Sequence, residues 1–395
     1  MARRSPLLIV WITVFVDLVG FGIIIPLQPF YVETAGGSGL EVGLLFASYS
    51  LAQFVFVPLW GRLSDRIGRR PVILLTLVGT GLSFFLFAAA YDSLLWLFVS
   101  RILAGFFGGN IAVAQAYVAD VTDEANRARG MGLIGMAFGL GFVLGPAIGG
   151  ALALLGPVWP PAFAGAMALA NALAAAFRLP ESHALAARDT EFRWLDARGW
   201  QAARADGSLA RLFALVFLST FAFANMETTF ALLAKRNLGL ERSGAALLFV
   251  FIGVISAGIQ GGLIGRLARR FGPARLVLTG TSVLALALLL APWVHHLATM
   301  LAICLLLAVG TSLNRPSLNT LISYRAGSTQ GAVLGTAASL GSLARVAGPA
   351  AGGVLWDLRY WLPYAVGAAV MLVAVLLALG LPTGAAPDAS AASTG

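Results

Sequence analysis

Ionisable side chains within long apolar segments are the residues of this sequence that are best placed to do chemistry. They are Asp17, Arg101, Glu227, Arg315 and Arg345. A charged group in the middle of a membrane-spanning helix costs about 3 kcal/mol or more on insertion scales, so such residues mark functional sites. A carboxyl group there can bind and release a proton, and an arginine can pair with it or hold an anion. These residue types therefore predict proton transfer and ligand binding within a membrane.

The composition indicates which elements must position these residues. The chain has 395 residues, of which 59% are hydrophobic and 11% are charged, and its mean hydropathy is +0.88. A bilayer core about 30 Å thick requires about 20 apolar residues per helix, and the apolar segments here are long runs rather than short alternating stretches. We therefore predict an all-α membrane protein with twelve transmembrane helices, at residues 7–30, 41–60, 72–91, 94–117, 130–154, 157–178, 209–233, 242–264, 275–294, 297–320, 330–353 and 360–381.

Internal similarity divides the chain into two halves. The stretch GRLSDRIG from Gly61 recurs as GRLARRFG from Gly265, and GPAIGG from Gly145 recurs as GPAAGG from Gly348. Because both pairs have nearly the same separation, they indicate duplication of a unit of six helices. We expect an N-terminal six-helix bundle at 1–178, a cytoplasmic linker at 179–208, a C-terminal six-helix bundle at 209–382 and a disordered tail at 383–395.

Basic residues outside the spans lie mostly on one side of the membrane. The exceptions are Lys235, Arg236, Arg242 and Arg359. An excess of arginine in short loops marks the cytoplasmic side, so we expect a multi-pass protein of the plasma membrane with both termini in the cytoplasm. The arginines are spread over loops without interleaved aromatic residues, so the net charge of +9 does not predict binding to nucleic acid.

The residues that most enzymes and metal sites require are missing. The single cysteine, Cys304, lies within a span, and the histidines, His183, His295 and His296, lie outside the spans. The sequence has neither a glycine-rich phosphate loop nor a Ser/His/Asp arrangement. We therefore expect no enzymatic activity, no cofactor and no metal site.

Two motifs carry a resemblance to a known family. GRLSDRIGRRPV, between the second and third spans, has its distinctive residues at Gly61, Asp65, Arg66, Gly68, Arg69 and Arg70. GLGFVLGPAIGG, in the fifth span, has them at Gly141, Gly145, Pro146, Gly149 and Gly150. The first resembles the signature loop of the major facilitator superfamily, and the second resembles a motif of its drug:proton antiporter branch. DLVGFGIIIP in the first span and RILAG in the fourth are similar to tetracycline-efflux-like members. The resemblance implies the major facilitator fold, in which two parallel repeats surround a central site.

The charged loop is expected to act as a cytoplasmic gate. In the family, the carboxylate at Asp65 faces the N-terminal end of the eleventh span when the cytoplasmic side is closed, and a helix dipole favours negative charge there. Arg69 or Arg70 could likewise meet Asp120, at the end of the fourth span. The alternative is that these charges only fix the orientation of the loop in the membrane.

Glycines in both motifs have expected structural roles. Gly61 and Gly68 are expected to supply turn conformations in the loop. In GLGFVLGPAIGG a glycine recurs once per helical turn, which lets a second helix approach closely, and Pro146 bends the helix. The stripe either seals the interface between the two halves or serves close packing alone.

In this architecture the first, fourth, seventh and tenth spans line the central cavity, and they carry Asp17, Arg101, Glu227 and Arg315 in that order. Asp17 and Arg101 are both expected near mid-depth, where they can meet. Apolar surroundings favour the protonated carboxyl group and a nearby guanidinium favours the ionised one, so movement of Arg101 or of substrate would make Asp17 a proton carrier. A static ion pair between the two helices is the alternative. Glu227 is a second candidate for proton coupling.

Polar groups on the same spans are candidate substrate contacts. They are Gln28, Gln115, Asn225, Arg315 and Asn319. Arg315 could bind an anionic group of the substrate or satisfy backbone carbonyls near the cytoplasm. Polar side chains in membrane helices also serve as hydrogen-bonding contacts between helices, which is the alternative for each of them.

The resemblance and the interior charges together predict a proton-coupled secondary transporter that exports a small, largely apolar compound by alternating access, as in multidrug efflux. Its expected partners are the substrate, protons and the lipid bilayer, and the protein is expected to be monomeric. A facilitator or symporter of a small metabolite is one alternative, and a non-transporting sensor or scramblase with the same fold is another. Tetracycline exporters carry an acid in the ninth span, whereas 275–294 has none, so tetracycline is not expected as the substrate.

Overall fold

The computed structural model describes residues 6–182, 197–326 and 330–381, and every regular element within these ranges is a helix. The first half of the chain forms α1 (Pro6–Ile24), α2 (Gln28–Thr34), α3 (Gly39–Ile67), α4 (Arg69–Ala89), α5 (Leu94–Phe107), α6 (Asn110–Val121), α7 (Glu124–Ala153) and α8 (Trp159–Arg178). The second half forms α9 (Ala197–Ala205), α10 (Gly207–Leu238), α11 (Arg242–Gly258), the π-helix η1 (Ile259–Leu263), α12 (Ile264–Phe271), α13 (Pro273–Leu290), the 3₁₀-helix η2 (Ala291–Trp293), α14 (Leu297–Arg325), α15 (Gln330–Leu358) and α16 (Leu362–Leu379).

Each predicted span falls on one or more of these helices. Within the described ranges, eleven helical stretches are long and apolar enough to cross a membrane. The remaining predicted span is α15, which is 29 residues long but contains Arg345 and many small residues. The predicted tail at 383–395 and most of the predicted linker lie outside the described residues.

Three predicted spans are interrupted rather than continuous. The first breaks after α1 at a turn that contains Pro26, which has no backbone N–H to continue the helix. The fourth breaks between α5 and α6 at Gly108 and Gly109, and the eighth passes through η1, which contains Gly261 and Gly262. At Gly109 glycine permits close packing, since a Cβ there would lie 2.7 Å from the side chain of Trp60.

Helix ends follow local sequence signals. Ser38 begins α3 with a capping box, in which its hydroxyl accepts from a backbone N–H and Glu41 accepts from the Ser38 backbone. Asp206 caps α10 by accepting from the backbone N–H of Ser208. Gly68, with φ of 102°, ends α3 and Gly239, with φ of 67°, ends α10, and both values favour glycine.

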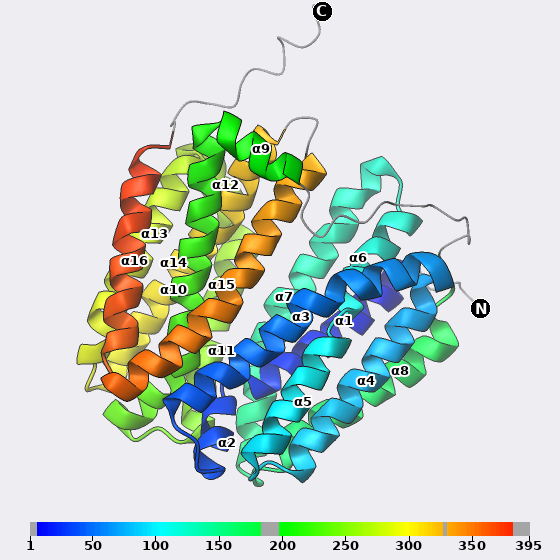
Figure 1. Ribbon diagram of the computed structural model, residues 1–395, viewed down its shortest axis with the longest axis horizontal. Coiled ribbons are helices and arrows are strands. Elements are labelled where there is room, and N and C mark those ends of the chain that lie inside the picture. The colour runs from blue at the N-terminus through cyan, green and yellow to red at the C-terminus, as the bar shows by residue number, and fades with distance from the viewer. Residues whose placement is uncertain (1–5, 183–196, 327–329, 382–395) are drawn as a thin grey trace, which may run out of the picture.

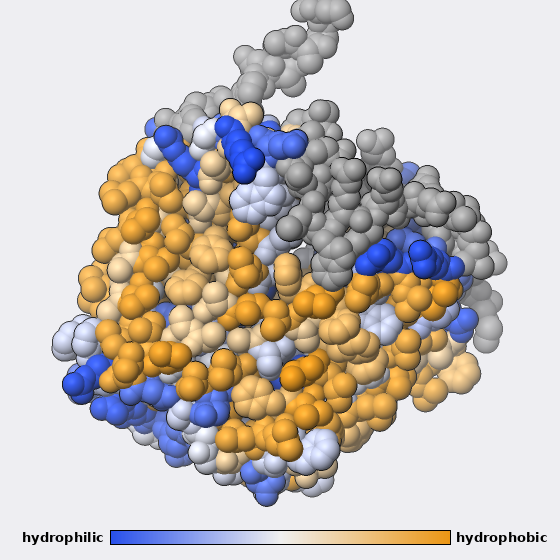
Figure 2. All heavy atoms as spheres, viewed as in Figure 1, coloured by the Kyte–Doolittle hydropathy of each residue, from blue (hydrophilic) through white to orange (hydrophobic). Residues whose placement is uncertain are grey.

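Two helical bundles lie side by side, one from each half of the chain (Figure 1). Between them, α3 packs along α15 and α7 packs along α11. Apolar side chains cover much of the outer surface, and hydrophilic residues gather toward its ends (Figure 2). Phe177 is 82% exposed, Leu154 77% and Leu376 69%. Exposed apolar surface on this scale is expected where lipid, and not water, surrounds a protein.

The bundles share a core at one end only. We call the end that holds the start of α1 and the end of α16 the terminal end, and the opposite end the distal end (Figure 1). At the distal end, one apolar cluster joins Ile23 and Leu45 of the first half to Leu232 and Ala246 of the second. Toward the terminal end, each bundle has a separate cluster formed only from its own residues. The bundles therefore meet at the distal end and diverge toward the terminal end.

Candidate functional site

The predicted interior charges lie on α1, α5, α10, α14 and α15. Asp17 lies on α1 and is half-buried, and its carboxyl group faces the amide of Asn110 on α6. One turn further along α1, the ring of Phe21 lies 5.3 Å from that of Tyr49 on α3. Tyr49 in turn lies within the electrostatic field of Asp17, Arg101 and Arg345. Tyr49 is thus influenced by charged residues of both bundles.

Arg101 is buried among aromatic rings in the first bundle. Its side chain is 2% exposed, and its guanidinium carbon lies 5.2 Å from the ring centre of Phe84 and 4.8 Å from that of Phe87. Within the described residues, its Nε and Nη2 atoms donate no hydrogen bond, and it forms no ion pair with Asp17. The predicted meeting of Asp17 and Arg101 is therefore absent from this conformation. Cation–π contacts offset only part of the cost of burying an unpaired charge.

A second group of charges belongs to the C-terminal bundle. Glu227 on α10 lies in the field of Arg315 on α14 and of Arg345 on α15, and the two arginines lie in the field of each other. Both arginine side chains are exposed although they stand near the middle of long helices. Within the part of the chain that the structure describes, neither forms an ion pair. The group therefore holds two cations and one acid.

The other predicted substrate contacts separate into buried and exposed residues. Gln115 and Asn319 are exposed, whereas Gln28 is 4% exposed. Asn225 is fully buried, and its amide donates a hydrogen bond of 2.5 Å to the carbonyl of Pro363 on α16. Asn225 therefore joins α10 to α16 in this conformation, where it is closed to a ligand.

The charged loop between α3 and α4 is held within the first bundle. Arg69 forms ion pairs of 2.6 Å with Asp65 and 2.9 Å with Asp120, so the contact predicted for Arg69 or Arg70 is made by Arg69. Arg70 instead donates to the carbonyl of Ala176 at 2.5 Å. In this conformation Asp65 has this partner on α4 and none among the described residues of α15.

The prediction that Gly61 adopts a turn conformation is wrong. Helix α3 continues past Gly61 to Ile67, and only Gly68 has positive φ. The loop is therefore a single-residue break, and the carboxylate of Glu181 accepts hydrogen bonds from the backbone N–H groups of Arg69 and Arg70 that follow it. The exposed Arg66 precedes this break.

The glycine stripe of α7 faces its own bundle rather than the other one. A Cβ on Gly145 would lie 2.6 Å from Gly22 of α1, and Gly141 and Gly149 lie as closely against Leu18 and Ile23 of the same helix. Pro146 lies inside α7. Gly150 faces the second bundle, where a Cβ would lie 2.8 Å from Ala246, and Phe142 and Val143 lie against Gly253 of α11. Its glycines at 141, 145 and 149 thus fix α7 against α1, while Phe142, Val143 and Gly150 contact α11 across the interface.

Contacts at the distal end were not predicted. The carboxylate of Asp357, at the end of α15, accepts hydrogen bonds of 2.8 Å each from the hydroxyl of Ser38 and the backbone N–H groups of Gly39 and Leu40. Lys235 pairs with Glu33 at 2.8 Å nearby. The sequence Ser-x-x-Glu at 38–41 signals the start of a helix, but nothing in it identifies the acid that faces this start from the other bundle.

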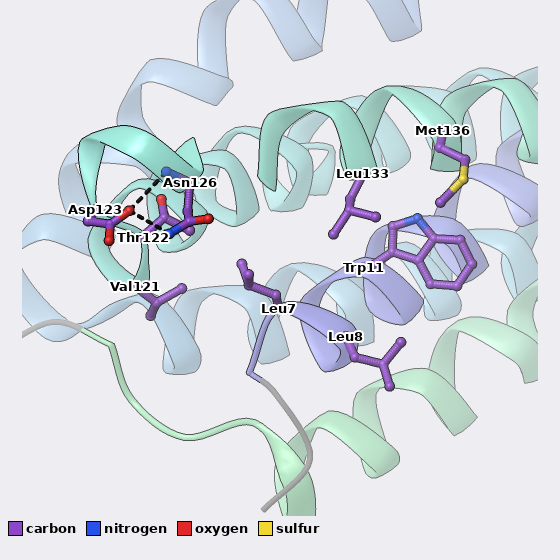
Figure 3. A pocket seen from close by; sticks show the side chains of 9 residues that line it. All are labelled: Leu7, Leu8, Trp11, Val121, Thr122, Asp123, Asn126, Leu133 and Met136. Atoms are coloured by element: carbon purple, nitrogen blue, oxygen red, sulfur yellow. Dashed lines mark hydrogen bonds between the residues drawn. The ribbon is translucent and has the colours of Figure 1, made fainter. Parts of the chain in front are cut away.

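A separate pocket of about 530 Å³ lies at the terminal end, away from the interior charges (Figure 3). Leu7 and Trp11 of α1 face Leu133 and Met136 of α7 across it, and Asp123 and Asn126 stand at one side. None of the interior charged residues lines this pocket.

Comparison with known proteins gives consistent matches over nearly the whole chain. The sequence profile described as Major Facilitator Superfamily matches residues 10–349 and 263–394. Multidrug resistance protein 2 of Bacillus subtilis (strain 168) is 30% identical over 385 residues, covering 95% of each chain. Tetracycline resistance protein, class C, of Escherichia coli is 30% identical over 386 residues, covering 94% of this chain and 96% of the relative.

Solved structures agree with these matches. The crystal structure of the human organic anion transporter MFSD10 (TETRAN) has a TM-score of 0.71 at 29% identity and covers 96% of this chain and 100% of that one. The nucleoside transporter NupG has a TM-score of 0.75 at 13% identity, covering 96% and 98%, and shares the fold.

Proposed function

Because the chain belongs to the major facilitator superfamily, whose members are transporters and not enzymes, we propose that it exports a small, largely apolar compound in exchange for protons. The exchange takes place across the plasma membrane by alternating access, and the protein works as a monomer. The relatives named for multidrug and tetracycline resistance support export as the direction. The absence of an acid in α13, where tetracycline exporters have one, argues for another substrate.

The observation that carries the proposal is the interior carboxyl group of Asp17. It is half-buried on α1, and among the described residues no cation lies within ion-pair distance of it. A carboxyl group in this setting is stabilised in its neutral form, and the approach of a cation stabilises the charged form. Asp17 takes up a proton when it faces the outside. It releases this proton to the cytoplasm when the surroundings change.

Arg101 is the cation proposed to cause this change. Its buried guanidinium has unused donor groups and lies in the field of Tyr49, which also lies in the field of Asp17. A shift of α5 relative to α1 that brings the two side chains together would ionise Asp17 and satisfy the arginine. Glu227, with Arg315 and Arg345 around it, is proposed as a second proton-coupling group in the other bundle.

The two ends of the molecule supply the gates. With both termini in the cytoplasm, the conformation described above is open to the inside, and the distal contacts close the outside. The charged loop at Asp65 and Arg69 closes the inside in the opposite conformation, by placing Asp65 at the start of α15. A transporter of this kind needs both gates because opening both at once would let protons leak.

Uptake into inverted vesicles tests the role of Asp17. With an acidic lumen, the unaltered protein should concentrate at least one member of a panel of neutral, cationic and anionic aromatic dyes, and an uncoupler should abolish this. Asp17→Asn should remove proton-driven accumulation while leaving dye binding measurable. Asp123→Asn is the matched control, since this exposed residue caps α7 and asparagine caps equally well. Proton-driven accumulation by Asp17→Asn would exclude Asp17 as the carrier.

A further inference from the structure

We propose that the substrate carries one carboxylate, which binds between Arg315 and Arg345, and an aromatic body, which lies against Phe21, Tyr49 and Phe142. This names the substrate class of the transport site and rests on the proposed transport function. Most of the surface of such an aromatic acid is apolar, as the proposed function requires. Its charge, however, makes it a different class from the lipophilic cations that an acidic cavity would select.

The first support is an uncompensated positive charge inside the protein. Arg315 and Arg345 come from neighbouring helices, α14 and α15, and each lies in the repulsive field of the other. Glu227 is the acid that shares their surroundings, and it can neutralise at most one of them. Within the described part of the chain, neither guanidinium has an ion pair. Two arginines that share one acid and form no ion pair are suited to bind an anion.

The second support is that both guanidiniums are accessible. Their side chains are exposed, and Arg315 stands beside Asn314, whose amide is fixed by a hydrogen bond of 2.7 Å to Thr281 on α13. Glu227, Arg315 and Arg345 influence one another electrostatically, and their helices α10, α14 and α15 pack in one bundle, so the three side chains belong to one region of that bundle. They therefore line the space between the diverging bundles, where a substrate can reach them.

The third support is an aromatic wall at the same depth on the other bundle. Helices α3 and α15 run antiparallel, and Gly43 lies against Pro349 and Gly353 too closely for a Cβ. Tyr49 on α3 and Arg345 on α15 are about equally far from this contact, in the same direction along the two helices. The two residues therefore lie at the same depth. Tyr49 lies in the field of Arg345, as this register requires.

Two phenylalanines extend this wall. Phe21 lies 5.3 Å from Tyr49 and 6.3 Å from Phe142, measured between ring centres, with the second pair edge to face. Three rings from α1, α3 and α7 thus form a continuous apolar surface at the level of Arg345. A planar aromatic body can stack on such a surface while its carboxylate reaches the guanidiniums. The distance between wall and arginines then selects for the length of the acid.

Direct binding tests the proposal independently of transport. The purified protein in nanodiscs of zwitterionic lipid is dialysed against radiolabelled 2-naphthylacetate, its uncharged amide 2-naphthylacetamide, or the cation 2-naphthylethylamine. We expect the acid to bind at least about tenfold more tightly than the amide, and the cation to bind most weakly. Arg315→Gln and Arg345→Gln should each bring the acid close to the affinity of the amide. Arg345→Lys should retain part of the preference, because it keeps the charge but loses the planar fork.

Matched controls separate loss of the site from loss of the fold. Arg270→Gln removes an arginine beside Phe271 at the end of α12, and it should keep the full preference for the acid. Binding of the amide should survive in both cavity variants, which shows that they are folded. Equal binding of acid and amide by the unaltered protein would overturn the proposal. So would a preference for the acid that both glutamine variants retain.

The outcomes also distinguish this proposal from the proposed function. Preference for the acid without any proton-driven accumulation in vesicles would leave the anion site standing and refute the exchange mechanism. Proton-driven accumulation of neutral or cationic dyes together with equal binding of acid and amide would do the reverse. Addition of anionic lipid to the nanodiscs tests whether a headgroup competes for the arginines, and a competing headgroup would replace the aromatic acid as the ligand.

Discussion

Removing the charge of Asp357 should open the distal side of the transporter. Its carboxylate accepts three hydrogen bonds at the start of α3, from Ser38, Gly39 and Leu40. An anion at a helix N-terminus contributes about 0.3–1 kcal/mol when exposed, and hydrogen bonds to a charged group add to this. Asp357→Asn keeps the shape but loses the charge, so the closed distal side should lose about 1–2 kcal/mol, or about 5–30-fold in population.

Because the chain has a single cysteine, an introduced reporter cysteine can measure this population. Cys304 is fully buried, so a reporter cysteine can be placed elsewhere in a Cys304→Ala background. Ala246 is buried at the distal interface against Gly150, and Ala246→Cys reacts with a thiol reagent only when the bundles separate there. The rate of labelling by a membrane-impermeant reagent from outside should rise by about 5–30-fold with Asp357→Asn, in line with the population shift.

Two controls define what would refute this reasoning. Asp92→Asn changes an exposed acid in the turn between α4 and α5 and should leave the labelling rate unchanged. Glu33→Gln breaks an exposed ion pair with Lys235, and such pairs contribute about 0–1 kcal/mol, so its effect should be smaller. If Asp357→Asn labels no faster than Asp92→Asn, the carboxylate does not hold the distal side closed.

Two further changes test the packing described above. Gly22→Ala places a Cβ 2.8 Å from the Gly141 carbonyl, so α1 and α7 must move apart. The melting temperature should fall as expected for about 1–3 kcal/mol of overpacking. The control is Gly135→Ala, whose Cβ meets nothing within 4 Å, and equal melting temperatures of the two variants would contradict the close approach of α1 and α7. Asn225→Ala removes the buried hydrogen bond to Pro363 and should lower the free energy of unfolding by about 1–3 kcal/mol. Substrate affinity measured by dialysis should not change. A loss of affinity without a loss of stability would show that Asn225 contacts the substrate.

Local sequence patterns were enough to predict most of the fold. Apolar runs of sufficient length predict helices wherever they occur, since a bilayer leaves few other solutions. The breaks at Gly108 and in η1 were missed because glycine within an apolar run is tolerated in a helix, and its tertiary surroundings decide whether the helix bends. Gly61 shows the opposite error: a glycine interpreted as a turn lies within α3, which continues to Ile67.

The candidate site was predictable in residue type but not in pairing. Asp17, Arg101, Glu227 and Arg315 were identifiable because charge in an apolar helix is costly wherever it points. Their partners depend on the rotation and depth of each helix, which periodicity does not determine to within a hydrogen-bond length. Asp17 therefore faces Asn110 and not Arg101 in this conformation. Asp357 was missed because its role comes from a helix start more than half the chain away.

Helices α3 and α15, each 29 residues long, carry an acid near the last turn of each. Asp357 of α15 engages the beginning of α3, and Asp65 of α3 is expected to engage the beginning of α15 when the molecule tilts the other way. In that scheme the two contacts exclude each other: the contact of Asp65 with α15 can form only after that of Asp357 with α3 is released. We therefore expect the two conformations to differ little in free energy, so that binding of the substrate or of a proton can shift the equilibrium between them.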